Sequence, residues 1–154
     1  MDILVRQYEE KDAGDFLSMA LDLWSDYDRQ ELNDLIAEAR QKQFQILVAA
    51  NKHDLIGFAM FSIREDYVEG ASSSPTGYLE GIYVKPAFRK YGVARTLYED
   101  GEKWVLSHGC IEIGSDTWTW NKGSQKFHVA LGFKEEEILV HFIKEIESVK
   151  SKNH

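Results

Sequence analysis

One stretch of the chain, residues 79–94, constrains its fold more than any other, because a buried strand pattern leads there into a basic turn and then a helix. The apolar run Ile82-Tyr83-Val84 precedes Pro86, which ends strand pairing because proline has no backbone N–H. Arg89-Lys90 then brings positive charge, and Gly92 keeps side chains away from an approaching ligand. Unpaired N–H groups and the helix dipole favour an anion at a helix start. The stretch indicates a phosphate site, although a helix start behind a solvated basic turn fits the same residues.

The length and charge of the chain narrow the class of protein. With 154 residues and 44% apolar residues we expect one domain over residues 1–147 and a frayed tail over 148–154. An excess of 26 acidic over 18 basic residues argues against nucleic acid or an anionic membrane as a partner and weakly favours a cationic substrate. The single cysteine, Cys110, and the absence of a signal-peptide pattern lead us to expect a cytoplasmic protein.

Hydrophobic periodicity predicts a mixed α/β chain with six strands and four helices. Two helix starts are predicted: one at Asp28, which with Glu31 forms a capping box, and one at Asn121, which acts as a cap without such a partner. Gly109 and Gly132 predict two helix ends. Residues 65–77 form the one long loop that we expect. The predicted strands cover residues 3–5, 44–50, 55–63, 78–84, 110–116 and 138–146, and the predicted helices begin near Asp12, Asp28, Val93 and Asn121.

The spacing Arg89-x-x-Gly92-x-Ala94 resembles the coenzyme A pyrophosphate loop of the GNAT acetyltransferase family, and the predicted order of elements also agrees with that family. The resemblance is strongest to its aminoglycoside 6′-N-acetyltransferases. The segments that carry this resemblance are Leu23-Trp24-Ser25-Asp26, Tyr67-Val68-Glu69-Gly70, Ser74-Pro75-x-Gly77, Leu79-Glu80-Gly81-Ile82-Tyr83-Val84, Ser115-Asp116 and His128-x-x-Leu131-Gly132-Phe133.

The resemblance implies a GNAT acyl-CoA N-acyltransferase fold: a central, mostly antiparallel mixed sheet, flanked by helices and splayed between strands 4 and 5. It also implies acetyl-CoA as the acyl donor and coenzyme A as the product. The residues that the resemblance assigns to this donor are Ile82, Tyr83, Val84, Arg89, Lys90, Tyr91, Gly92, Val93, Ala94, Arg95, Asn121 and Ser124. In the alternative, Asn121 is only the N-cap of the predicted helix.

Three residues are candidates for the chemistry of acetyl transfer, in which an amine loses a proton and a thiolate gains one. Glu80 and Asp116 lie where the resemblance places acids that face the amine. In the alternative without a functional role, Glu80 is a solvent-facing strand residue and Asp116 is a cap or turn residue. His128 occupies the position at which most of the family has a tyrosine that protonates the thiolate. A packing role for His128 remains equally open.

Aromatic and acidic residues near the expected acceptor cleft suit a polycation with apolar ring faces. We predict that the substrate contacts are Trp24, Asp26, Tyr67, Glu80 and Asp116. Trp24 also lies on the apolar stripe of a predicted helix, so its alternative role is packing in the core. No histidine spacing indicates a metal site.

The predicted function is acetyl transfer to the 6′-amine of an aminoglycoside, which confers resistance. The alternatives are a GNAT enzyme acting on a polyamine or a protein N-terminus, or a non-catalytic acyl-CoA-binding module. The resemblance also implies a homodimer, with the predicted strand Ile138 to Ile146 as its interface.

Overall fold

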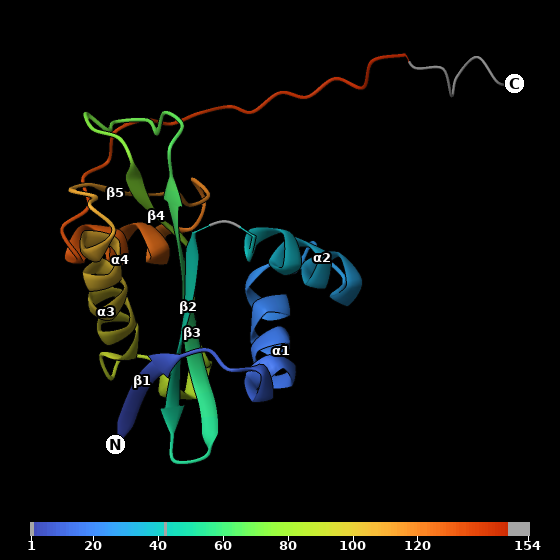
Figure 1. The fold of residues 1–154 in the computed structure, drawn as a ribbon, viewed down its shortest axis with the longest axis vertical. Helices are drawn as coiled ribbons and strands as arrows, with labels where there is room; N and C mark the ends of the chain where they lie inside the picture. Colours follow the sequence, from blue (N-terminus) through green and yellow to red (C-terminus); the bar gives the residue numbers. More distant parts are fainter. Residues whose placement is uncertain (1, 42, 148–154) are drawn as a thin grey trace, which may run out of the picture.

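A twisted five-stranded sheet in the order β1-β2-β3-β4-β5 forms the centre of the protein in a computed structural model that describes residues 2–41 and 43–147 (Figure 1). The first four strands pair antiparallel, and β5 pairs parallel to β4. This arrangement confirms the predicted mixed, mostly antiparallel sheet. The strands are β1 Ile3–Gln7, β2 Phe44–Asn51, β3 Asp54–Arg64, β4 Thr76–Val84 and β5 Ile113–Ser115.

Helices cover both faces of this sheet. Helices α1 and α2 lie on one side, and α3 and α4 lie on the other (Figure 1). The helix bounds are α1 Ala13–Leu23, α2 Arg29–Ala39, α3 Val93–Ser107 and α4 Lys122–Ala130, with short 3-10 turns at Glu10–Asp12 and Pro86–Phe88. Among these helices none is long and apolar enough to cross a bilayer.

The core consists of two apolar clusters, one on each face of the sheet. Phe58 and Phe16 belong to the cluster under α1, whereas Phe61 and Leu97 belong to the cluster under α3. All four side chains are almost fully buried. Because side chains alternate along a strand, Phe58 and Phe61 of β3 reach opposite faces across an odd spacing.

Helix ends follow the local predictions closely. Asp28 accepts a hydrogen bond from the Glu31 backbone N–H at 2.8 Å, and the Glu31 carboxylate accepts one from the Asp28 N–H, which completes a capping box. The side chain of Asn121 caps α4 through the Ser124 N–H. Gly132 follows α4 with a φ of +98°, a conformation in which glycine has no steric cost.

Three predictions need correction. Asp12 directly precedes α1, as predicted, but its carboxylate does not cap α1: it pairs with Arg6 of β1 and accepts from the Glu9 N–H of the preceding 3-10 turn. The strand predicted over 110–116 is confined to Ile113–Ser115, because only Gly77–Leu79 of β4 pairs with it.

The third wrong prediction is the last strand, Ile138 to Ile146. The described residues from 134 to 147 form no strand. Glu136 still lies against Gly70, and the segment then extends away from the body of the protein (Figure 1). A β pattern needs a neighbouring strand to pair with, and none of the described strands pairs with this segment. The predicted frayed tail, 148–154, lies outside the described residues.

Candidate functional site

The sheet opens into a fork where β4 and β5 part. Their pairing ends at Leu79 and Ser115, but β4 continues to Val84 with only β3 beside it. The β5-facing edge of Ile82, Tyr83 and Val84 is therefore free of strand pairing in the described part of the chain. Such an edge offers backbone hydrogen-bonding groups to a ligand that lies along it.

The turn after β4 has the conformation that an anion site requires. Lys90 and Gly92 have φ values of +72° and +79°, and α3 begins directly after Gly92 with no side chain capping it. The first N–H groups of α3 are thus available to a ligand. Arg89 is partly engaged already, since its Nε donates to the Val84 carbonyl oxygen at 2.7 Å.

These residues fit a coenzyme A pyrophosphate. A Cβ placed on Gly92 would meet no atom within 4 Å, so the space over the helix start is open to a ligand. Lys90 and the exposed part of the Arg89 guanidinium bring cationic charge to the same turn. The predicted donor site in this turn also includes Tyr91, Val93, Ala94 and Arg95, and their role stays a prediction.

The last turn of α4 lies near the fork through its contacts with neighbouring elements. The Arg95 guanidinium of α3 donates to the Ala130 carbonyl oxygen at the end of α4, at 3.0 Å. His128 of α4 contacts Ser115 of β5, with 2.7 Å between Nε2 and Oγ. The predicted donor residues Asn121 and Ser124 therefore belong to a helix that is attached to the edge of the fork.

An acidic group lies on the opposite, α1-facing side of the fork. The Tyr78 hydroxyl donates to Asp116 Oδ2 at 2.5 Å, and the Ser62 hydroxyl donates to Glu80. Tyr78 and Glu80 share a face of the sheet, because Arg64 contacts both of them across the register shift at Glu80. The structure thereby brings together the two carboxylates that the sequence predicts to face the acceptor.

Arg64 binds Glu80 and lies over the Tyr78 ring, and sequence reasoning missed it. Its Nη2 and Nε donate to Glu80 Oε1 and Oε2 at 2.9 and 3.1 Å, and its Cζ lies 3.4 Å from the centre of the Tyr78 ring. The signal available in the sequence was the spacing of Ser62 and Arg64, which places both on one face of β3. Glu80 is therefore neutralised by a guanidinium, whereas Asp116 accepts only from a neutral hydroxyl among its described partners.

Tyr78, which binds Asp116, has a strongly shifted pKa. Burial and then the hydrogen bond to Asp116 raise the pKa of Tyr78 well above its usual range. Tyr78 thus stays protonated at neutral pH and acts as a hydrogen-bond donor to Asp116.

The predicted aromatic and acidic substrate contacts differ in where they lie. Trp24 packs at the end of α1 against β4, so that a Cβ on Gly81 would come within 2.4 Å of its ring. Its ring centroid lies 5.9 Å from that of Phe58, so Trp24 has the core-packing role given above as its alternative. Asp26 and Tyr67 are exposed, and no described contact joins them to Glu80 or Asp116.

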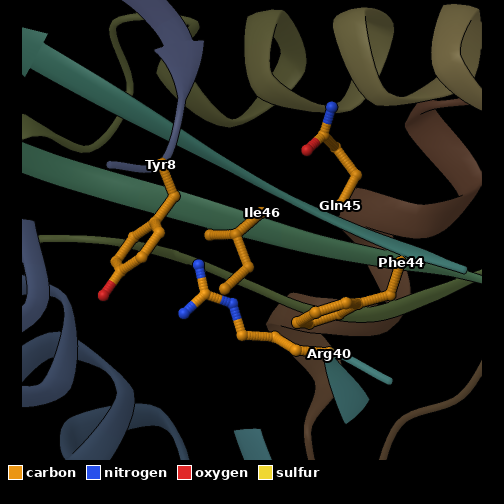
Figure 2. A pocket seen from close by; sticks show the side chains of 5 residues that line it. All are labelled: Tyr8, Arg40, Phe44, Gln45 and Ile46. Atoms are coloured by element: carbon orange, nitrogen blue, oxygen red, sulfur yellow. The ribbon is translucent and has the colours of Figure 1, made fainter. Parts of the chain in front are cut away.

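A small cavity of about 90 Å³ lies away from this fork, between β1, β2 and the end of α2 (Figure 2). Arg40 lies over the Tyr8 ring there and pairs with Glu10 at 2.9 Å. The cavity contains none of the predicted site residues. In the described ranges no cluster of three or more His, Cys, Asp or Glu side chains could hold a metal ion.

Comparisons with known proteins agree with this geometry. Residues 4–133 match the acetyltransferase (GNAT) family. The chain is 39% identical to an aminoglycoside N(6′)-acetyltransferase type 1 of Acinetobacter haemolyticus, over 93% of this chain and 99% of that protein. It is 37% identical to the protein of the same name from Stenotrophomonas maltophilia, over 90% of each chain.

Solved structures give the same result. Aminoglycoside N-acetyltransferase AAC(6′)-Iy in complex with CoA matches with a TM-score of 0.88 and 36% identity, over 94% of this chain and 96% of that one. The same enzyme in complex with a bisubstrate analogue, CoA-S-monomethyl-acetylneamine, matches with a TM-score of 0.86 and 37% identity, over 95% of this chain and all of that one.

Proposed function

Because this chain belongs to the GNAT acetyltransferase family, we propose that it transfers the acetyl group of acetyl-CoA to the 6′-amine of an aminoglycoside. The observation that carries the proposal is the fork between β4 and β5, which has an anion-binding turn at one end and the Glu80–Asp116 acidic group beside it. The near full-length similarity to aminoglycoside 6′-N-acetyltransferases supports the same acceptor.

The two sides of the fork serve the two substrates. Acetyl-CoA supplies the acetyl group as a thioester, with its pyrophosphate at the start of α3 and its arm along Ile82–Val84. Asn121 and Ser124 border the arm from α4. On the other side Asp116 attracts the ammonium group and accepts the proton that the amine must lose before it attacks, because an alkylamine has a pKa of roughly 10.4.

The test compares acceptors that differ in a single group. Neomycin has a 6′-amine and paromomycin has a hydroxyl at the same position, so acetyl-CoA with each of them, or with spermidine, gives a matched series. We expect free coenzyme A to be released with neomycin alone. Release with paromomycin would place the reaction at another amine, and release with spermidine would favour a polyamine acetyltransferase. Binding of acetyl-CoA without release in any arm would favour a non-catalytic acyl-CoA-binding module.

The proposed compartment is the cytoplasm, since acetyl-CoA is formed and used there. Burial raises the pKa of the Cys110 thiol, which makes this free cysteine unreactive. Secretion of the protein in its native host, shown by cell fractionation, would contradict this assignment.

The extended C-terminal segment supports a homodimer. Large apolar side chains follow one another there and are mostly solvent-exposed, namely Ile138, Leu139, Val140, Phe142, Ile143 and Ile146. Such a contiguous apolar surface is rare on a monomer. The outer edge of β5 has no strand beside it in the described residues, so a second copy could pair there.

Sedimentation of the purified protein tests the dimer. We expect the parent to sediment as a dimer and Phe142→Asp/Ile143→Lys to sediment as a monomer, with Tyr27→Asp, an exposed residue between α1 and α2, as the control that stays dimeric. A monomeric parent at micromolar concentration would contradict the proposal.

A further inference from the structure

The hydrogen bonds of His128 determine which ring nitrogen carries the proton. Its Nδ1 lies 2.7 Å from the carbonyl oxygen of Ser124, one turn earlier on α4. A carbonyl oxygen only accepts, so Nδ1 must donate. In the neutral ring Nε2 is then the acceptor, and the Ser115 hydroxyl 2.7 Å away must donate to it.

The ring is held in this orientation by apolar packing. The rings of Phe127 and Phe133 meet it edge-on, with centroids 6.0 and 5.2 Å away. The hydrogen-bond and ring contacts of His128 in the described structure come from β5, α4 and the residues after α4, and none of them is charged. His128 is therefore directed at Ser115, and in this state it has no proton to give to a thiolate.

Ser115 stands at the vertex of the fork. It is the last residue of β5, pairs with Leu79, and its Oγ lies 3.4 Å from the Leu79 carbonyl oxygen. Beyond this pair β4 has a free edge to Val84, along which the acyl donor is proposed to lie. Ser115 is half-buried, and its hydroxyl contacts His128.

We propose that Ser115 is a catalytic residue that protonates the departing sulfur, and that His128 acts through it as a positioning and proton-supplying residue. This inference rests on the acetyl transfer proposed above. It replaces the expectation that His128 itself donates to the thiolate.

The proton transfers balance along this path. The acceptor amine forms the N–C bond, the C–S bond breaks, and its electron pair remains on sulfur. Ser115 gives its hydroxyl proton to sulfur and takes one from Nε2 of protonated His128, which ends in the neutral form seen here. Asp116 or water takes the surplus proton of the nitrogen, and solvent restores the proton on His128.

The heavy atoms do not have to move during this exchange. Protonated His128 donates from both ring nitrogens, so Nδ1 keeps the Ser124 carbonyl and Nε2 reverses its bond to Ser115. Only the hydroxyl proton of Ser115 changes direction, from His128 toward the fork. A relay with fixed donor atoms has little reorganisation cost.

The first test needs no activity. Nitrogen-15 NMR of histidine-labelled protein, without substrates and above the titration of its histidines, reports the tautomer of each ring, and His128→Gln assigns the resonances. We expect the proton of His128 on Nδ1 and a shift of the Nε2 resonance in Ser115→Ala. A proton on Nε2 would overturn the relay.

The second test separates chemistry from binding. We expect Ser115→Ala to lower kcat about 100-fold, the effect of losing general acid catalysis, with both KM values nearly unchanged. Ser115→Thr, which retains a hydroxyl, should recover most of the rate. Ser115→Ala/His128→Gln should be no slower than the slower single variant, because the two residues act as one unit.

Controls distinguish the two proposals. Ser107→Ala removes an exposed hydroxyl at the end of α3 and should leave the rate unchanged. A parent protein that releases no coenzyme A with any acceptor contradicts the proposed function, whereas an active parent and an equally fast, folded Ser115→Ala contradict the relay alone. An acetyl thioester of an acidic aryl thiol releases a thiolate that needs no protonation. With this donor the loss of kcat in Ser115→Ala should be smaller than with acetyl-CoA, and an equal loss would also overturn the relay.

Discussion

Single residues decide the chemistry of the fork, and Gly92 is the clearest case. Its φ of +79° lies in the left-handed region, which costs an ordinary side chain free energy, and the space above it is open. Arg64 is the second case, because its guanidinium determines whether Glu80 presents a negative charge to an acceptor.

Gly92→Asp should greatly weaken the binding of acetyl-CoA. The substitution puts a side chain at an unfavourable φ and a negative charge next to the proposed pyrophosphate site. Isothermal titration calorimetry with coenzyme A measures the effect, with Gly14→Ala, in open space on α1, as the control. Unchanged affinity in a folded Gly92→Asp protein would contradict the role of this turn.

Glu80→Gln should raise the KM for the aminoglycoside by about tenfold, or roughly 1.4 kcal/mol. The reason is that the substitution leaves the Arg64 cation unpaired in a site for a polycation. Adding Arg64→Gln removes that charge and should recover most of the loss. If the double variant is as impaired as Glu80→Gln, Glu80 contacts the acceptor directly and Arg64 is incidental.

At the scale of elements, close packing of α3 on β3 holds the anion-binding turn against the sheet. Gly101 of α3 faces the buried Phe61, and a Cβ there would lie 2.0 Å from the ring. The same face of α3 carries Leu97 and Val105 into the core. The position of the start of α3 therefore depends on a glycine more than two turns away from it.

Gly101→Ala should destabilise the protein by up to about 2 kcal/mol, because an overpacking cost of about 1–3 kcal/mol outweighs the roughly 1 kcal/mol by which alanine favours a helix. Urea unfolding measures the difference. Gly14→Ala, with the same gain in helix propensity and no clash, should be neutral or stabilising. Equal stability of the two variants would show that Phe61 moves aside at no cost.

At the scale of the whole molecule, one buried ion pair ties the first strand to the first helix. Asp12 is 4% exposed and accepts from Arg6 Nη1 and Nη2 at 2.7 and 2.9 Å and from the Glu9 N–H at 2.8 Å. The hydrogen bonds from Arg6 lower the pKa of Asp12 against the opposing effect of burial. A carboxyl with a lowered pKa in the folded state stabilises the fold above the unfolded pKa of about 3.9 and loses this effect as the pH falls through its folded value.

Asp12→Asn should therefore lower the free energy of unfolding at pH 7 by about 2–4 kcal/mol, since it leaves Arg6 partly buried without its partner. The difference from the parent should shrink as the pH falls below about 4. Urea unfolding from pH 3 to pH 7 checks both expectations, with the exposed Asp34→Asn as control. A difference that stays constant over this range would contradict the assigned linkage.

The sequence by itself determined the order of the elements as far as α4, the helix ends at Asp28, Asn121 and Gly132, and the turn that leads from β4 into α3. These features depend on hydrogen bonds and φ preferences within a few residues, which a local pattern contains. The pairing of Arg64 with Glu80 was decided by the tertiary structure alone. It depends on the register of β3 against β4, including an irregularity between Met60 and Phe61 that no local pattern indicates.

Local sequence patterns also do not contain the contacts between distant elements that decide Asp12, Ile138 to Ile146 and His128. Asp12 looked like a helix cap, but a charged partner on β1 competes successfully for its carboxylate. The apolar run Ile138 to Ile146 is typical of a strand, yet a strand forms only where it pairs with another strand, and the described segment pairs with none. The orientation of His128 toward Ser115 was likewise settled in three dimensions, because hydrogen bonds from two separate elements fix the proton on its ring.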